Sequence, residues 1–182
     1  MPFSTSILPV PMGLRTADCV LQPLRASDVE RDYEAVMASQ EPLRHRTGGR
    51  WPRADFTLAE NLTDLEEHEA DFAAHRGFTY TVLDPSATRC LGCVYAYPLD
   101  TDAEDTAEAA VWFWVRPECV AAGIDRRLLA ALIPWLRDDF AFTRVLFRAS
   151  ANDAQQQALM HEAGLQERER RLWGSIETVL FE

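Results

Sequence analysis

Two aromatic, strand-like segments in the middle of the chain contain the side chains with the clearest potential for chemistry. Glu108 begins the second segment, and because side chains alternate along a strand it shares a face with Trp112 and Trp114. A carboxylate at that place could accept a proton from a bound molecule. Tyr95 and Tyr97 share one face of the first segment, where they could line a pocket or relay protons. The alternatives are a solvated carboxylate at a strand end and two ordinary aromatic core residues.

The cysteines and histidines do not indicate a metal site. Cys90 and Cys93 have CxxC spacing, but no second pair stands at the separation that zinc sites use. Both lie in a strand-like segment, where residues three apart face opposite sides. His68 and His75 lie on an expected helix without a third ligand and are interpreted as surface residues. We therefore predict no metal centre, and scattered cysteines are typical of a reducing cytoplasm.

Length and composition predict a cytoplasmic globular protein with a single domain. The 182 residues suffice for a sizeable core, and 47% hydrophobic with 26% charged residues is ordinary globular composition. No apolar run approaches the ~18–20 residues that cross a bilayer, and the N-terminus lacks a basic signal-peptide region, so no membrane attachment is expected. The net charge of −11 comes without a basic stripe, which argues against nucleic-acid binding. The acidity could steer a cationic substrate such as an amine, or could only confer solubility.

Hydrophobic periodicity predicts one α/β domain (α+β mixed) over 14–182, preceded by a loose N-terminal arm over 1–13. The order of elements is β-α-α-β-β-β-α-β-α-β-β, which gives a mixed seven-stranded sheet covered on both faces. Strands are expected near 19–24, 78–83, 91–97, 109–115, 144–148, 165–173 and 177–181. Helices are expected near 27–39, 57–76, 124–136 and 153–163, and loops at 40–56 and 100–106.

Capping motifs and a proline set the expected helix boundaries. Ser27 with Glu30, and Thr57 with Glu60, have the spacing of capping boxes that begin helices. Pro134 lies inside the periodic pattern of the third helix and is expected to kink or shorten it.

This order of elements resembles the GNAT superfamily of acetyl-CoA-dependent N-acetyltransferases over nearly the whole chain. The phrase LRTADCVLQPLRASD at 14–28 resembles the family's opening segment, and VWFWVRPE at 111–118 resembles the strand before its pyrophosphate loop. Gly164 with Leu165 resembles the ending that follows its last helix. The resemblance implies the GNAT fold, acetyl-CoA as cosubstrate, and direct transfer to an amine of a small molecule or peptide.

The resemblance also assigns cofactor-binding residues. A strand N–H would stabilise the oxyanion of the tetrahedral intermediate while the same strand pairs with the pantetheine arm. That strand contains Trp114, Val115 and Arg116. The backbone N–H groups of the following loop, at a helix N-terminus, would hold the CoA pyrophosphate. The loop and helix residues so implied are Val120, Gly123, Ile124, Asp125, Arg126 and Arg127, and Asn152 resembles a pantetheine contact, although Asn152 or Asp153 could be only a helix cap.

Asp18 and Gln22 replace two arginines of the family's opening segment, and three residues of the site motifs also depart from the family pattern. Val120 replaces an arginine or glutamine, and Asp125 replaces a small residue where a carboxylate would repel a phosphate by roughly 4 kcal/mol per charge pair. Arg126 and Arg127 could offset that repulsion. Met160 replaces a tyrosine general acid, so a thiolate would leave unassisted. These departures favour the alternative function, a catalytically inactive GNAT-fold binding or regulatory module; a third possibility is transfer from a different CoA thioester.

For acetyl transfer we predict Glu108 as the general base and Tyr97 as a proton relay. In this family the loop between the first two helices borders the acceptor site, and here it holds the one basic and aromatic cluster. That cluster is Arg44, His45, Arg46, Arg50, Trp51 and Arg53. We predict that Arg46, Arg50, Trp51 and Tyr95 bind the acceptor, with the arginines receiving an anionic group; the alternative is an exposed loop paired with nearby acids. The C-terminal hairpin at a sheet edge could pair two subunits in a homodimer.

Overall fold

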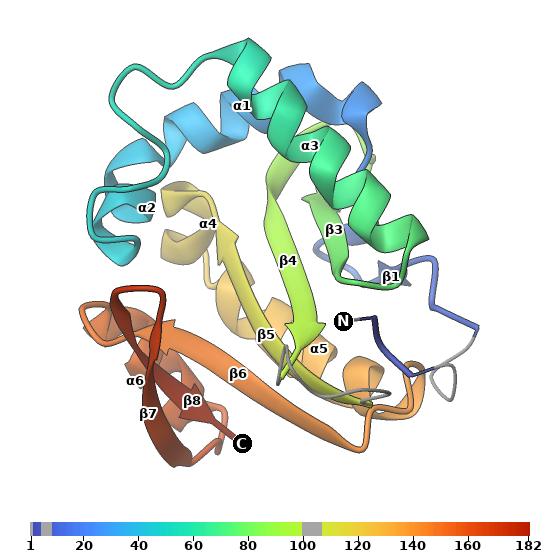
Figure 1. Cartoon of the computed structure of the whole chain (residues 1–182), viewed down its shortest axis with the longest axis vertical. Coiled ribbons are helices and arrows are strands. Elements are labelled where there is room, and N and C mark those ends of the chain that lie inside the picture. Colours follow the sequence, from blue (N-terminus) through green and yellow to red (C-terminus); the bar gives the residue numbers. More distant parts are fainter. Residues whose placement is uncertain (1, 5–8, 100–106) are drawn as a thin grey trace.

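One mixed sheet of eight strands organises the chain, in a computed structural model that describes residues 2–4, 9–99 and 107–182 (Figure 1). The strand order is β1-β2-β3-β4-β5-β6-β8-β7, and only β5 and β6 pair in parallel. The strands are β1 (Leu14–Arg15), β2 (Val20–Pro23), β3 (Phe78–Leu83), β4 (Cys90–Pro98), β5 (Glu108–Val115), β6 (Arg144–Ser150), β7 (Glu167–Trp173) and β8 (Ile176–Phe181). The predicted count of seven is wrong by one because Leu14 and Arg15 fold back on β2 as a short edge strand.

Helices cover both faces of the sheet. They are α1 (Val29–Ala38), α2 (Gln40–Arg46), α3 (Leu58–Ala73), α4 (Pro117–Ala121), α5 (Ile124–Asp138) and α6 (Ala154–Glu162). Alternate residues of β5 divide the core between these layers. Val111 and Phe113 pack on the side of α5 and α6, whereas Trp114 packs on the side of α1 and α3. The expected double coverage of this strand is therefore confirmed.

The parallel pair opens towards one end. β5 and β6 pair from Glu108 opposite Arg144 to Val111 opposite Phe147, and the ladder ends there although both strands continue. Figure 1 shows the two arrows diverging, with α4 and α6 beside the opening. An opening of this kind exposes the backbone of β5, which is where a ligand could add main-chain hydrogen bonds.

Two expected helix features differ in the structure. Residues 40–46 form α2 rather than a loop, with Leu43 buried on the sheet side. Helix α5 continues to Asp138 through Pro134, because burial of Trp135 and Leu136 outweighs the proline's local cost.

The predicted capping box at Thr57 is confirmed, since Thr57 and Glu60 exchange both hydrogen bonds. The predicted box at Ser27 is wrong, because Asp28 instead accepts the Arg25 N–H at 3.1 Å.

The described part of the N-terminal arm is packed rather than loose. Phe3 stacks on Phe78 with ring centroids 5.0 Å apart, and Tyr80 donates a hydrogen bond to the Pro11 carbonyl at 2.6 Å. The acidic loop expected at 100–106 lies outside the described residues. Among the described helices, none is long and apolar enough to cross a bilayer.

Candidate active site

A cavity of about 280 Å³ lies between the α1–α3 layer and strands β4 and β5. One face of α3, at spacings of three and four residues, presents Asn61, Asp64, Leu65 and His68 to it. We call this cavity the α3 pocket. Its full lining is Leu24, Asp32, Thr47, Trp51, Asn61, Asp64, Leu65, His68, Tyr95, Tyr97 and Trp112.

Stacked aromatic rings form the floor of the α3 pocket. Tyr95 and Trp112 are cross-strand partners of β4 and β5, and their rings stack with centroids 4.1 Å apart and an interplanar angle of 6°. The Tyr95 hydroxyl accepts a hydrogen bond from the Trp114 indole N–H at 3.3 Å. This floor presents flat apolar surfaces to an organic ligand, and the hydrogen bond from Trp114 fixes the position of the Tyr95 ring.

His68 is the buried imidazole of the α3 pocket. Its Nδ1 lies 3.0 Å from the Tyr97 hydroxyl and 3.2 Å from the Thr79 hydroxyl. Burial lowers the pKa of His68 below its ordinary value of 6.5, against an opposing effect of Asp64 and other carboxylates. The neutral ring therefore predominates near pH 7 and can accept a proton.

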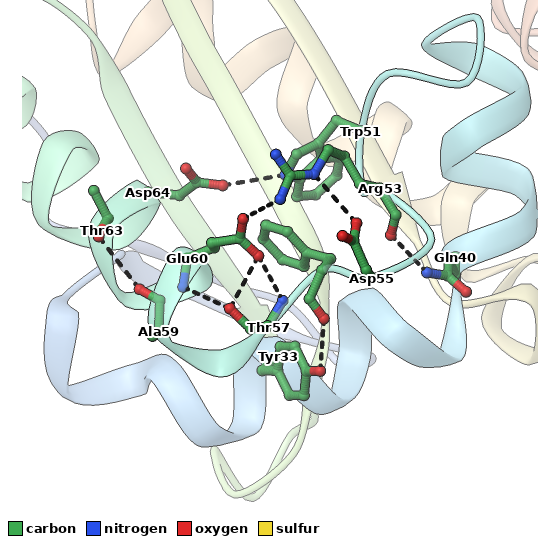
Figure 2. Close-up of polar contacts among 11 residues, drawn as sticks. Tyr33, Gln40, Trp51, Arg53, Asp55, Thr57, Ala59, Glu60, Thr63 and Asp64 are labelled. Carbon is green, nitrogen blue, oxygen red and sulfur yellow. Dashed lines mark hydrogen bonds and ion pairs between the residues drawn. The ribbon is translucent and has the colours of Figure 1, made fainter.

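Two carboxylates lie in the same lining. Asp64 accepts a hydrogen bond from the Trp51 indole N–H at 3.1 Å (Figure 2). Asp32 accepts from the Asn61 amide at 3.0 Å and from the Cys93 thiol at 3.3 Å. Burial raises the pKa of both carboxyl groups. A cation entering the pocket would favour their ionised forms and would be attracted by them.

The CxxC cysteines share a face, contrary to expectation. The register of β3 and β4 shifts between the pairs Val82–Gly92 and Leu83–Cys90, and this bulge turns Cys90 to the side of Cys93. Ligand atoms of Asp32, Cys90 and Cys93 all lie within 4.8 Å of one another, buried beneath the α3 pocket. Three ligands fall short of the four that a structural zinc site uses, and the absence of a metal stays a prediction.

On the side of α5 and α6, side chains narrow the opening between β5 and β6, and we call this part of the opening the β5–β6 cleft. Only about 10 Å³ is open among Phe113, Trp114, Val115 and the α6 side chains. The Gln156 amide donates a hydrogen bond at 2.9 Å to the Phe113 carbonyl, occupying a main-chain group that the parted ladder leaves free.

Helix α2 also bridges the mouth of this cleft. Arg46 forms an ion pair with Asp153, whose other oxygen caps α6 by accepting the Gln156 N–H at 3.0 Å. His45 Nε2 lies 3.0 Å from the Asn152 carbonyl oxygen. Asp153, and not Asn152, is thus the helix cap, and Arg46 is held by a carboxylate of the protein.

Outside the cleft, the helix start expected for a phosphate site is present. Gly123 has a left-handed backbone (φ 70°), and the first hydrogen bond of α5 joins the Arg127 N–H to the Gly123 carbonyl. The N–H groups before Arg127 in the first turn have no partner within the helix, and a cavity of about 220 Å³ beside this turn has Gly123, Asp125 and Arg126 in its lining.

The charges around that helix start are balanced by the protein itself. Arg126 pairs with Glu162, and Arg127 donates to Asp18 at 2.7 Å. With Asp125 added, acidic groups outnumber the arginines at this place. The sequence suggested that Arg126 and Arg127 could offset the negative charge of Asp125. In the structure these two arginines also neutralise Glu162 and Asp18.

Other predicted site residues lie away from the α3 pocket. Glu108 starts β5 at its opposite end, four residues and roughly 13 Å before Trp112. Arg116 is buried and donates a hydrogen bond to the Cys90 carbonyl at 2.7 Å. It also donates two hydrogen bonds, of 3.0 and 2.8 Å, to the carboxylate of Glu34. Its guanidinium therefore stabilises the fold. Met160 is fully buried in the core.

The basic cluster is divided among different contacts. Arg53 pairs with Asp55 and Glu60 at the start of α3, as Figure 2 shows, and Arg44 donates to the Pro52 carbonyl at 2.9 Å. Only Trp51 of this cluster joins the predicted residues Tyr95 and Tyr97 in the α3 pocket.

Sequence reasoning missed the polar face of α3. His68 was expected on the surface and is instead largely buried, beside Asp64 and Asn61. Asn61, Asp64 and His68 have the spacing of three and four residues that places side chains on one helix face. The same helix has an apolar periodicity, and that pattern alone was used to predict its buried face. Asp32 was missed because a carboxylate in α1 has no local signal of burial.

A sheet that opens between parallel strands beside a glycine-started helix defines an acetyltransferase-type fold. The family model described as the acetyltransferase (GNAT) domain matches residues 18–166. The match spans most of the chain, and the protein belongs to the GNAT acetyltransferase family. No curated protein sequence matches the chain.

Solved structures agree on the fold. A Vibrio cholerae protein, provisionally assigned as a ribosomal-protein-serine acetyltransferase, superposes with a TM-score of 0.75 at 16% identity, covering 93% of this chain and 95% of that one. The ribosomal-protein-S5-alanine acetyltransferase of Vibrio fischeri gives 0.73 at 14% identity, with 94% and 95% covered. The microcin C7 self-immunity acetyltransferase MccE, in complex with acetyl-CoA and AMP, gives 0.71 at 12% identity, with 94% and 96% covered.

Proposed function

We propose that the protein transfers an acetyl group from acetyl-CoA to a primary amine held in the α3 pocket. The observation that supports this most is the composition of that pocket. It combines a stacked aromatic floor, two carboxylates and a buried neutral imidazole, all on the face of β5 that borders the parted strands. A cationic amine needs the carboxylates for binding and a base for deprotonation, and the pocket supplies both.

Asp64 and Asp32 attract the protonated amine, and Trp112 with Tyr95 packs against its carbon chain. The volume of about 280 Å³ suits a small amine or a single residue of a peptide. The names of similar structures include a ribosomal-protein-S5-alanine acetyltransferase and a microcin C7 self-immunity acetyltransferase.

The amine must lose a proton before its nitrogen can attack a carbonyl carbon. Tyr97 and His68 offer a route, since the Tyr97 oxygen takes the proton from the amine while its own proton moves to His68 Nδ1, 3.0 Å away. The imidazolium that forms is stabilised by Asp64. We assign the base role to this pair in preference to Glu108, which lies at the far end of β5.

Acetyl-CoA, when bound, supplies the thioester whose carbon–sulfur bond breaks as the carbon–nitrogen bond of the amide forms. The first-turn N–H groups of α5 after Gly123 fit a pyrophosphate, and the β5 backbone at Phe113 fits a pantetheine arm. The fit requires Gln156 to release the Phe113 carbonyl. With Met160 in place of a proton donor, the departing thiolate takes its proton from water.

A second function is favoured by the filled β5–β6 cleft. Gln156 on Phe113 and the Arg46–Asp153 ion pair together leave about 10 Å³ where a pantetheine arm would pass. With these contacts in place, the protein acts as a non-catalytic module that binds amines in the α3 pocket.

The test is amine-dependent release of CoA thiol from acetyl-CoA, followed by mass measurement of the acetylated amine. The chain contains no lysine, so its own side chains add no primary amine to the background. Propionyl-CoA and succinyl-CoA in parallel define the acyl donor. Titration calorimetry with acetyl-CoA separates the two functions. Binding with turnover supports the transferase; the absence of both, with amines still binding, supports the module.

A further inference from the structure

A second cavity, of about 100 Å³, adjoins the α3 pocket on the β6 side. Thr47 and Trp112 line both cavities, so the Trp112 ring is a shared wall. Arg148 of β6 is its basic side chain on the sheet, and Ser150 and Thr178 add hydroxyl groups. We call this cavity the Arg148 pocket.

Of the two arginines that line this cavity, Arg46 pairs with Asp153, whereas Arg148 has no carboxylate partner among the described residues. Its guanidinium lies over the Trp173 ring, 3.6 Å from the centroid, and its Nε is buried without a hydrogen-bond partner. No carboxylate among the described residues forms an ion pair with it. By contrast, five arginines around the two cavities and the cofactor loop pair with carboxylates, namely Arg46, Arg53, Arg116, Arg126 and Arg127.

A partly buried cation without a charged partner is costly, and a bound anion would lower that cost. Burial lowers the pKa of Arg148 to about 10, so the group remains charged near neutral pH. Stacking on Trp173 leaves the edge of the guanidinium plane free, and its N–H donors there match the two oxygens of a carboxylate or phosphate.

The two cavities have opposite charge. The α3 pocket contains Asp32 and Asp64 with no arginine in its lining. The Arg148 pocket contains Arg148 and the Asp153-paired Arg46 with no carboxylate in its lining. Their strands are β4 and β6, on either side of β5. The backbones therefore lie at least about 10 Å apart, since two paired strand spacings give that distance and the β5–β6 ladder has already ended at Phe147.

We propose that the Arg148 pocket binds an anionic group, a carboxylate or phosphate, of the same acceptor whose amine occupies the α3 pocket. This inference rests on the proposed function for the identity of the amine pocket. The acceptor is then an amino acid or amino phosphate whose nitrogen and anion are separated by several bonds. The spacing disfavours α-amino acids, in which only one carbon separates the two groups.

The kinetic test compares 6-aminohexanoate with hexylamine, which has the same chain length and no anion. We expect kcat/KM to favour 6-aminohexanoate at least tenfold in the wild-type enzyme, and the preference to vanish in Arg148→Met. Arg148→Lys keeps the charge without the planar guanidinium and should retain part of the preference for 6-aminohexanoate. Its activity also shows whether a loss in Arg148→Met comes from misfolding. The control is Arg144→Met, four residues earlier on β6, where a partly exposed arginine pairs with Glu182.

Shorter amino acids of the same series locate the best spacing, and an aminoalkyl phosphate of matched length distinguishes phosphate from carboxylate. Equal kcat/KM for 6-aminohexanoate and hexylamine in the wild type overturns the inference and leaves the proposed function standing.

Calorimetry without acetyl-CoA distinguishes failure of the proposed transferase function from failure of the inference about Arg148. If 6-aminohexanoate binds the wild type and its affinity falls at least tenfold in Arg148→Met, the Arg148 pocket is established even where no turnover occurs. If 6-aminohexanoate binds wild type and Arg148→Met equally, the anion does not contact Arg148 and the inference is wrong.

Discussion

The Tyr97 hydroxyl lies 3.0 Å from His68 Nδ1, joining residues that are 29 positions apart in the chain. Tyr97 belongs to β4 and His68 to α3, so the contact connects the sheet with the helix layer above it. Both residues line the α3 pocket. Burial depresses the pKa of the imidazole, and this keeps a base ready at the end of a hydroxyl relay.

Replacing Tyr97 with Phe should lower kcat by about 100-fold with little change in KM, because general-base assistance is worth roughly 10²–10⁴ in rate. Tyr33→Phe is the matched control, since the Tyr33 hydroxyl donates a hydrogen bond to the Phe56 carbonyl outside the pocket.

In the wild type, activity should fall with decreasing pH through the lowered pKa of His68, because only the neutral ring accepts a proton. That acid limb should be absent from the residual activity of His68→Gln; its persistence would exclude His68 as the base.

Asp64 should set the affinity for the cationic acceptor. Asp64→Asn keeps an acceptor oxygen for the Trp51 indole but removes the negative charge from the pocket. We expect KM for the amine to rise about tenfold, as for loss of one partly buried charge-assisted contact worth about 1.5 kcal/mol. Steady-state kinetics check this against Glu66→Gln, an equal charge change on the exposed side of the same helix. An equal rise in KM for the two substitutions would mean that Asp64 acts only through the net charge of the protein and does not contact the amine.

Much of the fold was predictable because alternation and capping act locally. The double coverage of β5 followed from apolar residues on both of its faces, and the start of α3 followed from Thr57 and Glu60. The extra strand at Leu14 could not be predicted, because two residues carry no periodicity and their pairing depends on β2.

The candidate site was less predictable because its geometry depends on tertiary contacts. One bulge in β4 was enough to turn Cys90 to the side of Cys93, against strict alternation. The acids that pair with Arg46 and Arg116 lie 107 and 82 positions away in the numbering, at Asp153 and Glu34. No local pattern identifies these partners. The sequence leaves Arg46 either as an acceptor contact or as paired with a nearby acid, and it places Arg116 only on the strand expected to bind the cofactor.

The Glu34–Arg116 pair should shape the stability of the protein in acid. Hydrogen bonding from the Arg116 guanidinium lowers the pKa of Glu34, so the pair stabilises the fold above the unfolded-state pKa. That contribution is lost as pH falls through the lowered folded-state pKa, below about 4.3. Because the carboxylate is largely exposed, Glu34→Gln should cost under about 1 kcal/mol at pH 7.

Urea unfolding between pH 7 and pH 3 measures this contribution. The destabilisation by Glu34→Gln should shrink as the pH drops below about 4.3, where the wild type has lost the same charge. Glu30→Gln, on the exposed surface of α1, should show no such pH dependence. Arg116→Met should cost more, about 1–3 kcal/mol, because it leaves the buried Cys90 carbonyl unsatisfied. Identical pH profiles for Glu34→Gln and Glu30→Gln would contradict the assignment.

The Gln156 amide on the Phe113 carbonyl should control access of acetyl-CoA to β5. Gln156→Ala removes the side chain from the β5–β6 cleft and leaves that carbonyl for a ligand, so acetyl-CoA should bind several-fold more tightly in calorimetry. The apo protein should lose about 1–3 kcal/mol of stability, because a buried acceptor then lacks its donor. Gln157→Ala is the control, since its amide bonds the Ser150 and Ala151 carbonyls instead. Tighter binding in Gln156→Ala alone means that the cleft opens by releasing this one contact. Unchanged binding in both variants would mean that Gln156 does not obstruct the cofactor.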